Sequence, residues 1–152
     1  MHNREHVLIS LAPRHADNIL NGIKSVEFRR RTMNISPGAI IWIYVKLPVG
    51  SIVARVKVAS VHRLSPTTLW KRFGAVSGLT RSEFFGYFRG VKRGAALVLE
   101  DCRRLHQAFS LAALRKIDGA FHPPQFFSRL HIEAPLFNAI SSPNGNWNPY
   151  AA

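Results

Sequence analysis

The chain has 152 residues, of which 47% are hydrophobic, which is typical of one globular domain with a hydrophobic core. Lysine and arginine number 21 against 8 aspartate and glutamate residues, a formal net charge of +13 that favours a polyanionic partner such as nucleic acid. The single cysteine, Cys102, excludes an internal disulfide, and no apolar run reaches the roughly 18 residues of a membrane span. We therefore expect a cytoplasmic protein with no membrane association.

The first predicted elements are a strand and a helix joined directly. The apolar run VLISLA at 7–12 is typical of a buried strand, and Pro13 suits the first turn of a helix. Apolar residues then recur at helical spacing, and Gly22 stands near the expected end of the helix. These signals predict a helix over about 13–21.

The segment GIKSVEFRRR, residues 22–31, changes to a period of two, which is typical of a strand. Alternation places the polar side chains of Ser25, Glu27, Arg29 and Arg31 on one face. Two interpretations of this face remain open. Lys24 and Glu27 form a functional polar cluster, or Lys24 is solvated while Glu27 makes an ordinary surface salt bridge with an arginine.

The middle of the chain predicts further strands and two short helices. The run at 39–47 is apolar on both faces and predicts a central strand, and alternation predicts another strand over 51–61. Ser65 followed by Pro66 is typical of a helix start, and Thr80 with Glu83 has the spacing of a capping box.

The last third predicts a strand over 94–105, a mildly helical segment SLAALRKIDGAF, and a rigid extended segment HPPQFF. Consecutive strands joined by short turns favour antiparallel pairing, so we expect an α+β fold with a curled sheet or small barrel flanked by short helices. Residues 1–140 are expected to form one domain, and the polar, turn-rich residues 141–152 a flexible tail.

Signals for metals and cofactors are lacking in the sequence. The seven histidines show no HxxxH or HxH spacing, and neither GxGxxG nor GxxxxGK[ST] occurs. Cys102 follows Asp101, whose charge would raise its pKa and make it a poor nucleophile. We expect no cofactor and no metal.

Several motifs, in order, resemble one known family. LISLAP leads into ILNGIKSVEFRRR, and PGAIIWIYVKLPVGSIVARVKV follows; LW at 69–70, TRSEFFGYFRG, GAALVL and HPPQFFSRL continue the match. Over about residues 7–131 the chain resembles the ASCH domain family of the PUA-like superfamily. The last motif is similar to a bacterial subgroup described as predicted regulators.

The resemblance implies a small, mostly antiparallel PUA-like β-barrel with a basic cleft beside the first helix and the GxKxxExR turn. It also implies a partner that is RNA, another nucleic acid or a modified nucleoside. One branch of the family hydrolyses N4-acylcytidine with a Lys, a Thr three residues later and a distant Glu. Here Lys24 is kept but Glu27 replaces the Thr, and a carboxylate does not substitute for a hydroxyl nucleophile in that reaction.

We therefore expect a nucleic-acid-binding domain, most simply an RNA-binding regulator of translation or transcription. The expected binding residues are Lys24, Glu27, Arg29, Arg30, Arg31, Tyr44 and Trp70. Tyr87, Phe126 and Phe127 are further aromatic candidates for base stacking. The alternative is an enzyme, either a hydrolase of a modified nucleoside or a ribonuclease, with Lys24, Ser25 and Glu27 as candidate catalytic residues.

Overall fold

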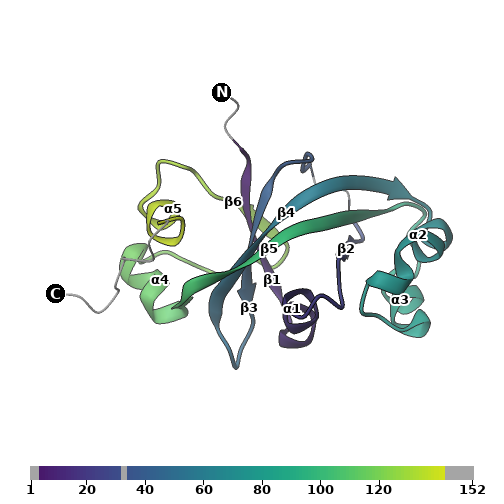
Figure 1. The fold of residues 1–152 in the computed structure, drawn as a ribbon, viewed down its shortest axis with the longest axis horizontal. Coiled ribbons are helices and arrows are strands. Elements are labelled where there is room, and N and C mark those ends of the chain that lie inside the picture. The colour runs from purple at the N-terminus through teal and green to yellow at the C-terminus, as the bar shows by residue number, and fades with distance from the viewer. Residues whose placement is uncertain (1–3, 32–33, 143–152) are drawn as a thin grey trace.

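A computed structural model describes residues 4–31 and 34–142. Its centre is one sheet of six strands in the order β2-β5-β4-β3-β1-β6, with short helices around it (Figure 1). The strands are β1 (His6–Leu11), β2 (Val26–Arg29), β3 (Ile40–Val45), β4 (Ser51–Leu64), β5 (Gly94–Ser110) and β6 (Phe127–Arg129). The helices are α1 (Pro13–Leu20), α2 (Pro66–Phe73), a 3-10 turn η1 (Gly74–Val76), α3 (Arg81–Tyr87), α4 (Leu111–Ile117) and α5 (Pro135–Ile140). The expected α+β class is confirmed.

Two long antiparallel strands, β4 and β5, form the spine of the sheet (Figure 1). Their pairing shifts register at three places along β4, and such irregularities bend strands and strengthen their twist, which curls the sheet. The other neighbours also pair antiparallel, except β1 and β3, which run parallel. Because β1 and β3 are parallel, the chain leaves both strands at the same edge of the sheet.

The core is divided among three groups of buried side chains. One lies between the sheet and α1 and includes Ile9, Ile19 and Ile43. A second lies where α4 and α5 cover the sheet, at the left of Figure 1, and the third joins β2 and β5 to α2 and α3 at the right. The helices at the two ends therefore flank a middle region where α1 packs on the sheet.

The start signals of the two middle helices are confirmed. The Ser65 side chain accepts a hydrogen bond from the Thr68 amide, and Thr80 and Glu83 form the reciprocal capping box at α3. The strands β4 and β5 are longer than the sequence pattern predicted. They continue past residues 61 and 105 because they pair with each other there. The sequence also gave no separate signal for α5, whose Leu136 and Ile140 are buried in the second core group.

Among the described residues, no helix combines the length and apolar character that crossing a membrane requires. The flexible tail predicted for 141–152 lies almost entirely outside the described residues, which end at Ser142.

Candidate functional site

A pocket of about 390 Å³ lies where β1, α1, β2 and α3 approach one another. We call it the polar pocket. Its walls come from the end of β1, from α1, from β2, from the turn after β3 and from α3. The lining residues are Ser10, Leu11, Ala12, His15, Lys24, Glu27, Phe28, Arg29, Lys46, Leu79, Glu83 and Tyr87.

Lys24 is turned into the protein by the segment that follows α1. Gly22 adopts a φ of +78°, a conformation that glycine takes without strain, and the Lys24 amide donates to the Asn18 carbonyl at 2.9 Å. The chain thus folds back, and Lys24 is only 3% exposed. Its Nζ donates to the Ser77 carbonyl oxygen at 3.0 Å. The interpretation of Lys24 as a solvated lysine is therefore wrong.

Lys24, Glu27 and Arg29 form one charged cluster. Glu27 is 7% exposed, although it lies on the face of β2 opposite to its core neighbours Val26 and Phe28. One carboxylate oxygen lies 3.3 Å from Lys24 Nζ and the other lies 2.9 Å from Arg29 Nη2. Buried charges need such partners, and two cations on one anion leave the cluster with a net charge of +1.

Three buried polar atoms that point to a ligand line this pocket. Ser10 Oγ, His15 Nδ1 and Arg29 Nε have no hydrogen-bond partner among the described residues. They come from β1, α1 and β2, so three elements bring them to one place. An unmatched buried polar group costs about 1–3 kcal/mol, and native proteins have few of them. Three of the residues that line the pocket thus carry a hydroxyl, an imidazole nitrogen and a guanidinium N–H that have no partner in the described chain.

His15 is held toward its neutral form. Burial lowers its pKa from the usual 6.5, and the charge of Lys24 lowers it further, against a smaller opposing effect of Glu27. A neutral imidazole has one nitrogen that accepts a proton or hydrogen bond. His15 was not expected as a site residue, because nothing in the local sequence of α1 distinguishes it.

The rim of the pocket is closed by an ion pair between two helices. Arg14 on α1 binds both carboxylate oxygens of Glu83 on α3, and its Nη2 also donates to the Gly78 carbonyl at 3.1 Å. The Arg14 guanidinium and the Thr80 amide hold the pKa of Glu83 at about 2. This pair ties α1 to α3, and both helices contribute lining residues to the pocket.

Lys46 supplies a further cation at the edge. Its amide donates to the Leu11 carbonyl at 2.9 Å, because β1 and β3 end at the same edge of the sheet. Its side chain is exposed, in contrast to Lys24. Ser10, His15, Lys46 and Glu83 are the polar lining residues that the sequence did not suggest for the site, since only the tertiary fold brings them beside Lys24 and Glu27.

Arg30, Arg31 and Ser25 lie outside the polar pocket, whereas Tyr87 lines it. Arg30 donates from Nη2 to the Arg89 carbonyl at 3.2 Å, and Arg31 lies over the ring of Phe126. Ser25 precedes β2, and its amide donates to the Val76 carbonyl at 2.9 Å. Roles for these residues in binding or catalysis stay predictions.

The two aromatic residues first chosen for base stacking are packed in core groups. Tyr44 is 2% exposed and contacts Phe121. Trp70 packs against Phe84 and Phe85. For Tyr44, this burial leaves no ring face for a base, because a stacked base needs an open face.

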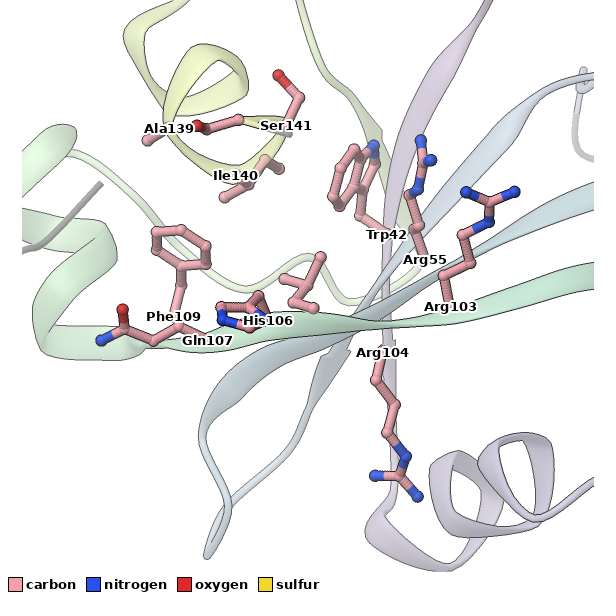
Figure 2. Close-up of a pocket in the computed structure, with 12 residues that line it drawn as sticks. Trp42, Arg55, Arg103, Arg104, His106, Gln107, Phe109, Ala139, Ile140 and Ser141 are labelled. Atoms are coloured by element: carbon pink, nitrogen blue, oxygen red, sulfur yellow. The ribbon is translucent and has the colours of Figure 1, made fainter. Parts of the chain in front are cut away.

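A second pocket of about 310 Å³, the α5 pocket, lies between α5 and the strands β4 and β5 (Figure 2). Arg55 and Arg103 are opposite each other on β4 and β5 and project to the same side, whereas Arg104 points away (Figure 2). Both projecting arginines are engaged: Arg55 lies over the Trp42 ring, and Arg103 Nε donates to Asp101 at 3.0 Å. None of the unpartnered buried side-chain atoms found in the described chain lines this pocket. The polar pocket is the stronger candidate site.

The described residues hold no group of three or more His, Cys, Asp or Glu side chains that could bind a metal ion. Cys102 lies on β5 and lines neither pocket; burial is the main cause that raises its pKa, and Asp101 adds to it. The polar groups that line the polar pocket are cations, carboxylates, hydroxyls and an imidazole.

Comparison with known proteins identifies the family. The ASCH domain model matches residues 9–113. The ASCH domain-containing ribonuclease of Zymomonas mobilis is 34% identical over 131 residues, which are 86% of this chain and 88% of that protein. The chain therefore belongs to the ASCH domain family.

Solved structures agree with this assignment. The crystal structure of the ASCH protein from Zymomonas mobilis has a TM-score of 0.82 at 33% identity, covering 87% of this chain and 92% of that one. The N-terminal domain of McrB from Staphylothermus marinus has a TM-score of 0.53 at 11% identity, over 86% of this chain and 93% of that one. The second likeness shows the fold alone. A PUA-like fold is thus supported for this protein.

Proposed function

We propose that this protein binds single-stranded RNA and holds one nucleotide in the polar pocket. The observation that carries the proposal is the convergence of Ser10 Oγ, His15 Nδ1 and Arg29 Nε, all buried and unpartnered within the described chain, in a pocket with cationic walls. Arg29 and Lys46 would contact phosphate, and Ser10 and His15 would contact the base edge or the ribose. An RNA-binding protein of this kind would suit a regulator of translation or transcription.

The net charge supports a phosphate-bearing ligand. A formal charge of +13 on 152 residues attracts nucleic acid of any sequence, while the pocket selects for a chain whose bases and 2′-hydroxyls are accessible. A folded duplex does not offer a single nucleotide to a pocket of about 390 Å³. Single strands are therefore the preferred form.

The proposal is tested by replacing a serine that has no partner in the free protein. Because Ser10 Oγ has no hydrogen-bond partner in the described chain, Ser10→Ala should leave the free energy of unfolding unchanged or raise it. If a ligand uses that hydroxyl, the same variant should weaken RNA binding about fivefold, which corresponds to about 1 kcal/mol. Fluorescence anisotropy with a labelled single-stranded RNA measures the affinity.

Ser51→Ala is the matched control. Ser51 is also buried, but its Oγ donates to the Val49 carbonyl at 3.1 Å and it lines neither pocket. This variant should lose some stability and keep its affinity for RNA. A wild-type affinity that does not change with salt, or a Ser10→Ala variant that binds as tightly as wild type, would contradict the proposal.

A second candidate function is RNA cleavage, and it is favoured by His15 together with a relative that is named a ribonuclease. A neutral imidazole beside Lys24 is suited to take the proton of a ribose 2′-hydroxyl. The 2′-oxygen would bond to the adjacent phosphorus while the bond from phosphorus to the 5′-oxygen breaks, and the 5′-oxygen would take a proton from solvent. The products are a 2′,3′-cyclic phosphate and a 5′-hydroxyl.

A cleavage assay with single-stranded RNA in the presence of a chelator separates the two functions. If the wild type cleaves, His15→Gln should reduce the rate by about 10²-fold or more while RNA binding is retained. Without wild-type turnover, metal-independent cleavage is excluded and binding stands. We do not extend the proposal to hydrolysis of acylated cytidine, because both oxygens of Glu27 are engaged by Lys24 and Arg29.

A further inference from the structure

A second hollow adjoins the polar pocket and has a different character. Its volume is about 630 Å³, and it is lined by the three arginines 29–31 and by Tyr87, Val91, Phe126 and Phe127. We call it the aromatic slot. Its lining combines positive charge with apolar rings, which is the combination that binds a base and its phosphate.

Phe126 is the most exposed ring in the slot. It is 60% exposed, whereas its neighbour Phe127 begins β6, pairs with Ile9 and packs against the first core group. Phe126 lies in the bend just before β6, so the strand pairing that holds Phe127 in the sheet does not include Phe126. The exposure of Phe126 therefore follows from how β6 joins the sheet.

Arg31 is positioned on the same ring. Its guanidinium carbon lies 5.5 Å from the centre of the Phe126 ring, within the range of a cation–π contact. The neighbouring Arg30 is held by hydrogen bonds to Tyr87 Oη and the Arg89 carbonyl, whereas the contact of Arg31 in the slot is with the Phe126 ring. A planar base that enters between Arg31 and Phe126 would meet a ring on one side and a guanidinium on the other.

The aromatic slot and the polar pocket share two lining residues, Arg29 and Tyr87. Arg29 is bound on one side by Glu27 and carries a buried Nε without a partner among the described residues. A phosphate between two consecutive nucleotides would therefore meet Arg29 while the two bases occupy the two hollows. Free nucleosides have no such phosphate and fill only one of them.

We propose that the aromatic slot is a base-stacking subsite for the nucleotide adjacent to the one in the polar pocket. The ligand class is then single-stranded RNA of at least two nucleotides, and not a free nucleoside. This inference rests on the proposed function, since it assigns the neighbouring nucleotide of the same RNA chain. Phe126 and Arg31 sandwich the base, and Arg29 binds the phosphate that joins the two nucleotides.

The test compares a mononucleotide with a dinucleotide. The probes are uridine 5′-monophosphate and 5′-phosphorylated uridylyl-uridine. Both probes carry 2′-O-methyl groups, which block cleavage through the 2′-oxygen. Wild-type protein should bind the dinucleotide at least tenfold more tightly than the mononucleotide. Phe126→Ala should weaken dinucleotide binding about tenfold, as expected for the loss of one base–aromatic stack, and leave mononucleotide binding unchanged.

Two further variants make the result specific. Phe126→Trp should keep or strengthen dinucleotide binding, and its added indole fluorescence should be quenched on binding if a base stacks on it. Ile132→Ala removes an apolar side chain that is also exposed, at 41%, and lines neither hollow, so it should change nothing.

The outcomes separate this inference from the proposed function. If Ser10→Ala weakens binding but Phe126→Ala does not, the stacking subsite is refuted and the polar pocket stands. Equal wild-type affinities for the two probes would also refute it. If neither probe nor a longer RNA binds the wild type, the proposed function itself fails.

Discussion

Lys24→Met removes the buried ammonium at the centre of the polar pocket while keeping an unbranched side chain of similar length. Two charge-assisted contacts are lost, one to the Ser77 carbonyl at 3.0 Å and one to Glu27 at 3.3 Å. The Ser77 carbonyl then lacks that donor, and Glu27 depends on Arg29 alone. The variant therefore tests whether the buried cation stabilises the fold.

The expected loss is about 3 kcal/mol. Breaking a buried ion pair by removing one partner costs about 3–5 kcal/mol, because the remaining charge is left uncompensated. The low end of that range applies here, since Arg29 Nη2 remains 2.9 Å from the second oxygen of Glu27. For a chain of this size each 1 kcal/mol shifts the melting temperature by about 2–4 °C, so we expect a decrease of about 6–12 °C.

Urea denaturation followed by circular dichroism measures the change, and Lys46→Met provides the comparison. Lys46 lines the same pocket but is exposed, and surface substitutions usually stay within about 0.5 kcal/mol of wild type. If Lys24→Met is within about 1 kcal/mol of wild type, or if both lysine variants lose the same amount, the argument from buried pairing is wrong.

The remaining predictions concern pH and packing. Burial and the charge of Lys24 lower the pKa of His15 in the folded protein, so the neutral imidazole contributes stability that is present above pH 6.5 and is lost as the pH falls through the folded pKa. His15→Gln should therefore make the free energy of unfolding less dependent on pH in this range, as measured by urea denaturation between pH 7.5 and 5. Gly94→Ala would place a Cβ 2.2 Å from the Phe88 ring and should cost about 1–3 kcal/mol. Gly86 lies in α3 with open space around it, so Gly86→Ala should instead stabilise the protein by about 0.5–1 kcal/mol. Thermal melting distinguishes the two glycine variants, and stabilisation by both of them would contradict the packing argument.

The sequence predicted the local part of the site well because local rules decide it. A period of two places Glu27 and Arg29 on one face of a strand, and they do pair, at 2.9 Å. The helix before this strand was predicted from apolar spacing and Gly22, and α1 ends at Leu20. Such features depend on residues within a few positions of one another.

Contacts between segments that are distant in the chain could not be predicted from the sequence. The buried Nζ of Lys24 donates to the Ser77 carbonyl, which is 53 positions away in the sequence. Ser10 and His15 join the pocket through the parallel pairing of β1 and β3 and the packing of α1. Period-two alternation did not show whether the polar face of β2 meets solvent or a pocket, since both allow polar side chains.

The polar pocket keeps features that oppose stability. Three unpartnered polar atoms and a buried cluster with net charge +1 each cost free energy relative to a well-packed apolar core. The fold tolerates this cost because β4 and β5 and the three core groups provide burial elsewhere. A ligand that satisfies the three atoms recovers part of that cost only when it binds, so stability lost in the free protein becomes binding free energy. The same reasoning explains why Ser10→Ala should separate stability from binding, whereas Ser51→Ala should not weaken binding at all.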